Sequence, residues 1–174
     1  KLLDFKAIVN DNSQLFEKAL VGEPAVPQLL TQVDRIAKKS GLTVARLSYS
    51  FSGIKDEALL ISGQINYIDV NLSGLGSYAQ MVDFMKNLEN SARVINVESL
   101  RFAQERIDST NVLGMTFILK SPYMYVKSNA VTDDPVNIDI TSSLFTNMAA
   151  KVKKLTYYQI SPNEVIEVKE TTSS

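Results

Sequence analysis

The sequence contains no cysteine, no histidine and no tryptophan. Zinc sites of the usual kind need Cys or His ligands, so this absence excludes them. A thiol nucleophile, a Ser–His pair and a histidine general base are excluded on the same ground. Disulfides are impossible too, but many exported proteins lack Cys, so the compartment stays open. We therefore predict a protein that is not an enzyme, with no catalytic residues, no metal and no cofactor.

An excess of charge of one sign is also missing, since 18 Lys and Arg stand against 19 Asp and Glu. Such a balance provides no broad positive field for nucleic acid and no polybasic anchor for anionic lipid. No stretch is an unbroken apolar run of about 18 residues, the length that a membrane helix needs. We expect no nucleic-acid partner, and a membrane only through a span absent from this chain. The chain begins at Lys1 without a Met, so we expect a fragment whose natural start lies upstream.

What is present is one pattern that occurs twice in tandem: an amphipathic helix followed by two strand-like runs. The first copy covers residues 27–75 and the second residues 77–122. Each copy has one apolar helix stripe and two half-apolar strands, which is too little to bury alone. The two copies together predict an α+β fold, a ferredoxin-like two-layer sandwich with a four-stranded antiparallel sheet and both helices on one face. A fold of this kind hosts many functions.

The boundaries of these elements are marked by residues with defined roles. Pro27 suits the first turn of a helix, Gly41 suits a left-handed stop, and Ser77 with Gln80 forms a capping box. The apolar stripe of the first helix comprises Leu29, Leu30, Val33, Ile36 and Ala37. The stripe of the second comprises Tyr78, Met81, Val82, Phe84, Met85 and Leu88.

The predicted strands cover 44–51, the run 58–74, 94–102 and 112–119, with a turn at 108–111 and Pro122 closing the last strand. Their predicted buried faces are read from the alternation of apolar residues, namely Ala45, Leu47, Tyr49 and Phe51 in the first, Ile68, Val70 and Leu72 in the second, and Leu113, Met115, Phe117 and Leu119 in the last.

The flanking segments divide the chain into three parts. Residues 1–22 form a helix whose Leu2, Phe5, Val9 and Phe16 follow the three-and-four spacing of a coiled coil, although packing on its own domain explains the spacing equally well. Residues 26–124 form the ferredoxin-like domain. Residues 125–174 form a linker plus a C-terminal extension with a helix over 140–155.

Three groups of residues could indicate nucleotide binding, calcium binding or acid–base catalysis, but a structural role explains each group better. Gly74 and Gly76 precede a helix, as in a dinucleotide fingerprint, but follow a hairpin strand, so we interpret them as allowing a tight turn and close packing. Asp133, Asp134 and Asp139 match no calcium loop and suit a solvated linker. Asp56 and Glu57 lie on a turn tip with no apolar pocket to raise a pKa.

The side of the sheet that the helices leave free is the better candidate for a functional surface. Two helices on one face leave the other face and two edges open, and an edge strand can pair with a partner chain. Tyr67, Val112 and Ile118 supply an apolar patch there. The residues thus predict a protein-interaction module that forms dimers.

Five stretches resemble the PilO family of type IV pilus assembly proteins. Residues 26–30 (VPQLL) and 37–42 (AKKSGL) are similar to its first helix. Residues 70–78 (VNLSGLGSY) and 81–89 (MVDFMKNLE) are similar to its second motif, where a strand runs into a turn and a helix. Residues 94–97 (VINV) match the strand that follows. The resemblance covers about residues 26–124.

The resemblance implies a single-pass protein of the inner (cytoplasmic) membrane, with a coiled coil next to the membrane and this domain on the periplasmic side. It also implies pairing with itself, with a structurally similar partner (PilN), or both, and contact with other subunits of the pilus machine. A non-enzymatic scaffold domain is the leading hypothesis. The alternative is a small-molecule-sensing regulatory domain of the ACT-like type, binding a metabolite near residues 74–77.

Overall fold

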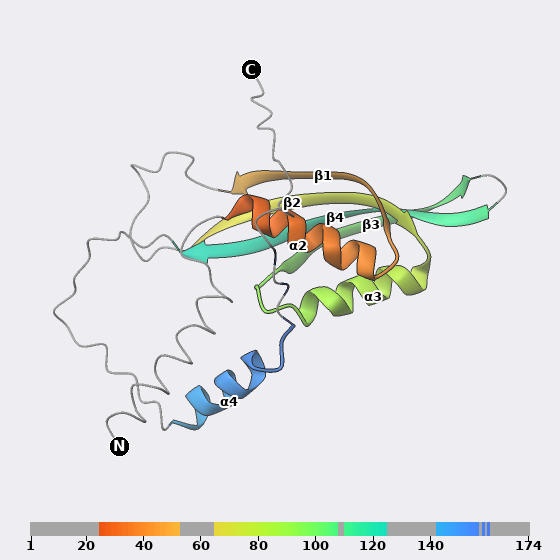
Figure 1. The fold of residues 1–174 in the computed structure, drawn as a ribbon. Coiled ribbons are helices and arrows are strands. Elements are labelled where there is room, and N and C mark those ends of the chain that lie inside the picture. Colours follow the sequence, from red (N-terminus) through yellow and green to blue (C-terminus); the bar gives the residue numbers. More distant parts are fainter. Residues whose placement is uncertain are drawn as a thin grey trace.

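A computed structural model describes residues 25–52, 65–107, 110–124, 142–156, 158 and 160. Figure 1 shows the elements in chain order. They are α2 (Val26–Lys39), β1 (Thr43–Ser52), β2 (Ile65–Gly76), α3 (Tyr78–Glu89), β3 (Asn96–Ile107), β4 (Thr110–Met124) and α4 (Ser143–Val152). The order of the first six confirms the predicted αββαββ repeat.

The four strands form one sheet in the order β1-β2-β4-β3, with every neighbouring pair antiparallel. Figure 1 shows α2 and α3 side by side on one face of this sheet, and no other described helix covers the opposite face. The predicted fold class, a ferredoxin-like α+β sandwich of two layers, is therefore confirmed. The strands β1 and β3 form the two edges.

The helix α2 ends as the sequence predicts. Gly41 has a φ of +78°, a left-handed conformation that glycine adopts without strain, and its N–H donates to the carbonyl oxygen of Lys38 at 2.9 Å. The N–H of Leu42 then donates to the carbonyl oxygen of Ala37 at 2.9 Å. Because of this turn, the side chain of Leu42 folds back and is buried.

The helix α3 begins with the predicted capping box. The backbone N–H of Ser77 donates to Oε1 of Gln80 at 2.7 Å, and the N–H of Gln80 donates to the Ser77 hydroxyl at 3.3 Å. The prediction that Tyr78 belongs to the buried stripe is wrong, since its side chain is 65% exposed. The stripe that α3 buries begins one turn later, at Met81, and Tyr78 precedes it.

Both repeats contribute to a single core between the helices and the sheet. The rings of Phe84 on α3 and Phe117 on β4 meet edge to face, with centroids 4.9 Å apart, and neither side chain is exposed. The fully buried neighbours come from α2, β2, α3 and β4 and include Leu29, Val33, Ile36, Ile68, Val70, Leu72, Leu88 and Leu119. Neither repeat encloses this core alone.

The edge strand β1 departs from its predicted pattern at two positions, since Phe51, predicted to be buried, is 36% exposed, and Ala45 is exposed too. Its register with β2 shifts between Val44 and Arg46, which is a β-bulge. As a result Val44 packs against the core, whereas Ala45, predicted to be buried, is exposed. The bulge adds one residue to the strand and so reverses the alternation on its N-terminal side.

The strands β3 and β4 are both longer than predicted. β3 continues five residues past Phe102, and β4 contains Pro122 instead of ending at it. Pro122 pairs with Tyr67 of β2 on one side. On the other side β3 begins opposite Lys120, so no β3 residue lies beside Pro122. Proline has no backbone N–H to donate, and it is tolerated at this position because no strand on that side needs the hydrogen bond. In Figure 1 the β3–β4 hairpin extends beyond the helices.

The C-terminal extension docks on the domain beside the end of α3. The N–H of Ala92 donates to the carbonyl oxygen of Thr156 at 2.9 Å, and the N–H of Thr156 donates to that of Asn90 at 2.6 Å. Tyr158 packs against the core, with the ammonium of Lys39 5.6 Å from its ring centroid. The helix α4 lies within the predicted range 140–155, and its Met148 side chain is 47% exposed.

A buried arginine links the start of α2 to strand β4 of the sheet. The Nε–H of Arg93 donates to the hydroxyl of Ser121 at 3.1 Å, and its Nη1 donates to the carbonyl oxygen of Ala25 at 3.5 Å. Only 6% of Arg93 is exposed, and this burial lowers the pKa of its guanidinium to about 10. The residue therefore fixes the start of α2 against β4.

Candidate functional site

The face of the sheet opposite α2 and α3, the open face, is covered by no helix of the described part of the chain. Alternation along β2 and β4 places Tyr67, Asp69, Asn71 and Ser73 on this face, because Ile68, Val70 and Leu72 face the helices. Their partners in register on β4 are Pro122, Lys120, Ile118 and Thr116. This face is mainly polar, in contrast to the apolar face beneath the helices.

The predicted interaction residues Tyr67, Val112 and Ile118 all lie on the open face. Tyr67 is 36% exposed, while Ile118 and Val112 are half-buried. They do not form one patch, since Ile118 lies about 13 Å along the sheet from Tyr67 and about 20 Å from Val112, at about 3.3 Å per residue. All three belong to the central strands, so the face and the edges are separate surfaces. The other predicted residues lie outside the described part of the chain, namely Leu2, Phe5, Val9 and Phe16.

A charged cluster surrounds Tyr67. The ammonium of Lys120 lies 2.9 Å from the carboxylate of Glu98 and 5.7 Å from the centroid of the Tyr67 ring. The hydrogen bond to Glu98 is the main cause that raises the pKa of Lys120 above its usual value. Asp69 is the register partner of Lys120, and its Oδ2 accepts a hydrogen bond from the Ser52 hydroxyl. Lys120 and Glu98 thus form an ion pair, whereas the buried Oδ1 of Asp69 has no hydrogen-bond partner among the described residues.

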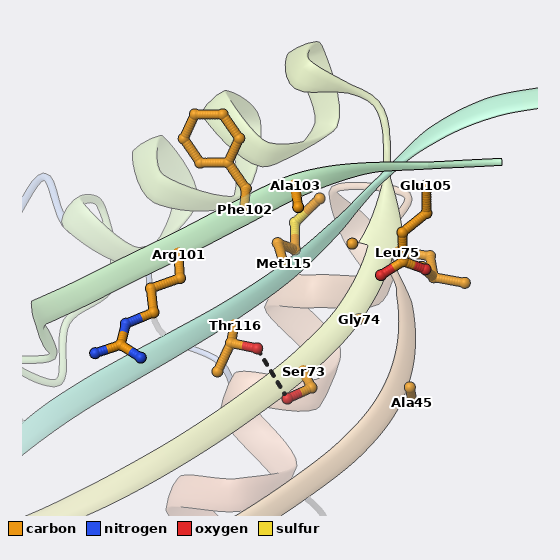
Figure 2. Close-up of a pocket in the computed structure, with 11 residues that line it drawn as sticks. Ala45, Ser73, Gly74, Leu75, Arg101, Phe102, Ala103, Glu105, Met115 and Thr116 are labelled. Carbon is orange, nitrogen blue, oxygen red and sulfur yellow. Dashed lines mark hydrogen bonds between the residues drawn. The ribbon is translucent and has the colours of Figure 1, made fainter.

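A shallow depression of about 520 Å³ lies at the other end of the open face. Small residues of all four strands line its floor, and Figure 2 shows Arg101 and Glu105 at its two ends. The hydroxyls of Ser73 and Thr116 lie 3.3 Å apart on the floor. The sequence has no histidine to activate a hydroxyl. The depression therefore offers a hollow with one positive and one negative rim residue.

The glycines next to this depression serve packing, as the sequence interpretation holds. A Cβ on Gly74 would lie 2.6 Å from the backbone oxygen of Thr43, and one on Gly76 would lie 2.6 Å from a methyl of Leu42. Both glycines belong to β2, whose two sheet neighbours are antiparallel, so the parallel crossover unit of a dinucleotide site is not formed there. Gly74 also lines the depression, so a metabolite bound near residues 74–77, as the alternative hypothesis expects, would lie at this hollow.

Candidate metal and acid–base residues gain no support from the described part of the chain. Among the described residues no three Asp, Glu, His or Cys side chains gather as a cation site. The residues weighed for calcium and for acid–base chemistry lie outside the description, namely Asp56, Glu57, Asp133, Asp134 and Asp139. No described helix is both long and apolar enough to cross a bilayer.

The outer edge of β3 is the surface that sequence reasoning missed. Phe102 is 54% exposed and Val97 is 39% exposed, although both point toward the helix side of the sheet. The side chains of residues 101–106 are all exposed. The sequence carries only a weak signal for this edge, because the apolar alternation of Leu100 and Phe102 gives way to the polar Gln104 and Arg106.

The fold and its open surfaces define the class of protein first: a ferredoxin-like sandwich with an uncovered sheet face and a long free edge. The family comparison then defines the group within that class. The sequence model described as "Type IVa pilus alignment subcomplex PilO C-terminal domain" matches residues 25–127. This match covers more than half of the 174 residues. The chain belongs to the PilO family of pilus assembly proteins.

A solved structure agrees with this assignment at the level of the fold. The chain is similar to the crystal structure of the type 4 fimbrial biogenesis protein PilO from Pseudomonas aeruginosa, with a TM-score of 0.50 and 18% sequence identity. The similarity covers 71% of this chain and 89% of the other. None of the curated proteins compared matches the sequence.

Proposed function

We propose that this chain is a non-enzymatic scaffold domain of a type IV pilus assembly machine, or of a related secretion or competence machine, and that it acts by dimerisation. Membership of the PilO family is the observation that carries the proposal. Its partners are a second copy, a PilN-like relative, or both, together with other subunits of the machine. Contacts between proteins, not bond chemistry, are its activity.

The surfaces of the domain support a binding role. The open face presents Tyr67 and Ile118 beside the Lys120–Glu98 ion pair, and the side chains of residues 101–106 on the edge strand β3 are exposed. The Ser73 and Thr116 hydroxyls lie 3.3 Å apart and hydrogen-bond to each other. A surface of this kind can hold a partner chain, because backbone groups of an edge strand and exposed aromatic rings are common contact groups.

The proposal includes a location and a division of the chain. We place the domain on the periplasmic side of the inner membrane, held by a single span outside this sequence. Residues 1–22 end a coiled coil through Leu2, Phe5, Val9 and Phe16, residues 26–124 form the interaction domain, and residues 125–174 form the extension. The docking of Thr156 and Tyr158 beside α3 indicates that this extension stabilises the domain.

The test places a charge on the proposed coiled-coil stripe. We expect Phe16→Asp to weaken dimers in sedimentation velocity and to lower the amount of surface pili when it replaces the chromosomal copy in the source bacterium. Gln14→Asp is the matched control, because it adds the same carboxylate off the stripe. Normal pili in the Phe16→Asp strain and in a strain that lacks the gene would contradict the proposal.

The alternative, a metabolite sensor, predicts a different result. A ligand in the depression beside Gly74 and Arg101 would raise the melting temperature of the chain by several degrees in a screen of amino acids and related metabolites. The scaffold proposal predicts no such shift with any compound. One compound that gives the shift, and loses it in Arg101→Ala, would favour the sensor.

A further inference from the structure

The outer edge of β3 has the properties of a strand that pairs with another chain. β3 has 12 residues and has only β4 as a neighbour within the described sheet. From Ser99 to Ile107 its register with β4 is continuous. This part contains no proline and no lysine, residues that often protect edge strands from pairing. Among the described residues, no strand pairs with the outer backbone N–H and C=O groups of this part.

The charges on this edge are arranged symmetrically about one residue. Arg101, Ala103 and Glu105 share the open face of the sheet, as Figure 2 shows, with Arg101 two residues before Ala103 and Glu105 two residues after it. Neither Arg101 nor Glu105 forms an ion pair within the described residues. An antiparallel partner strand with the reverse arrangement of charges would pair with both.

A second copy of β3 has that reverse arrangement. If a two-fold axis passes through Ala103, each Arg101 lies directly opposite Glu105 of the other copy, so the pair forms twice. Phe102 then faces Gln104 across the strands and lies diagonal to the other Phe102, within reach of an aromatic side chain. The contact would cover the side chain that is 54% exposed in the single chain.

We propose that two copies of this chain pair through antiparallel β3 strands with the two-fold axis at Ala103, forming a continuous eight-stranded sheet. The inference rests on the proposed function in one respect, that the domain acts as a dimer, and it names the surface and the register. The partner is a second copy because the charge pattern of the edge is complementary to itself.

Other registers place the charges less favourably. Opposite residues must share a face, so the axis passes through a single residue. An axis at Arg101 or at Glu105 places like charges opposite each other. An axis at Phe102 pairs the two aromatic rings but leaves Arg101 opposite Ala103 and Glu105 opposite Ser99. Only the axis at Ala103 pairs both charges, and this difference makes the register testable.

The first test exchanges the charges in the full 174-residue chain. Arg101→Glu alone and Glu105→Arg alone each create two pairs of like charges, so we expect the dissociation constant of the dimer to rise about tenfold or more. The double variant Arg101→Glu with Glu105→Arg restores both opposite pairs and should restore the dimer. Sedimentation equilibrium measures all four chains, and circular dichroism checks that each is folded.

The second test uses the absence of cysteine. Ala103→Cys introduces the only thiol of the chain, and residues on the axis of an antiparallel pair have Cα atoms about 4.5–5.5 Å apart, which a disulfide can bridge. We expect rapid formation of a covalent dimer on mild oxidation. Ser50→Cys, on the opposite edge strand β1, is the matched control and should stay monomeric on a denaturing gel without reductant.

The outcomes separate this inference from the proposed function. A dimer that is unaffected by the charge variants and not linked through Ala103→Cys would overturn the β3 pairing and leave dimerisation standing. Loss of the dimer in the double charge variant as well as in both single variants would also overturn it. A wild-type chain that stays monomeric at every concentration would contradict the dimer itself.

Discussion

The two faces of the sheet are built from the same strands and differ in almost every property. On the face beneath α2 and α3, Val70 and Leu72 are each 1% exposed, and Phe117 is fully buried. On the opposite face, Tyr67 is 36% exposed, and Asn71 and Thr116 are polar. A period of two lets one strand carry both sets of side chains, so the fold is specified by one face and the other is free to bind.

The largest predicted difference in stability between the two faces is for two neighbouring residues of β4. Phe117→Ala removes a ring from the packed core and should lower the free energy of unfolding by about 3–5 kcal/mol. Ile118→Ala, one residue along on the open face and half-buried, should lower it by about 1 kcal/mol. Urea unfolding followed by circular dichroism measures both. Equal losses would mean that the open face contributes to stability as the core does.

Two glycines allow a second comparison, between a site blocked by a backbone atom and a site on the open surface. A methyl on Gly74 meets the backbone oxygen of Thr43 at 2.6 Å, so Gly74→Ala should cost about 1–3 kcal/mol of stability. A methyl on Gly114 meets only the carboxylate end of Glu105, which can turn away into solvent. Gly114→Ala should therefore cost less than about 0.5 kcal/mol. Thermal unfolding of both variants decides whether the backbone contact or the open surface limits substitution.

The smallest effect concerns the charged cluster on the open face. The Glu98 side chain raises the pKa of Lys120, so its favourable effect on the folded state is present below the unfolded pKa of Lys120 and is lost as pH rises through the folded value. In an NMR titration the pKa of Lys120 should lie above its ordinary value. Glu98→Gln should lower it, whereas Asp83→Asn, on α3, should leave it unchanged.

Much of the fold follows from local sequence signals. The capping box at Ser77, the stop at Gly41 and the helix stripes depend on residues close together in the chain, and they are confirmed except at Tyr78. The tandem repeat also gave the correct layers, because neither copy can bury its apolar residues alone. What sequence reasoning could not reach are features set by pairing between distant strands.

The bulge at Ala45 is one such feature, since alternation alone places this residue with the buried set. The length of β3 is another, because hydrogen bonds to β4 extend the strand through the charged residues after Phe102. The candidate site reflects the same limit. Tyr67 and Ile118 were placed on the correct face, but the sequence does not reveal that they lie apart or that β3 forms the exposed edge.

The central claim is that the domain acts by joining two chains into a dimer. Sedimentation equilibrium of the unmodified chain over a wide concentration range tests it most directly, with the folded state monitored in parallel. The account predicts a reversible dimer whose population rises with concentration. A folded chain that remains strictly monomeric at the highest concentration would contradict it.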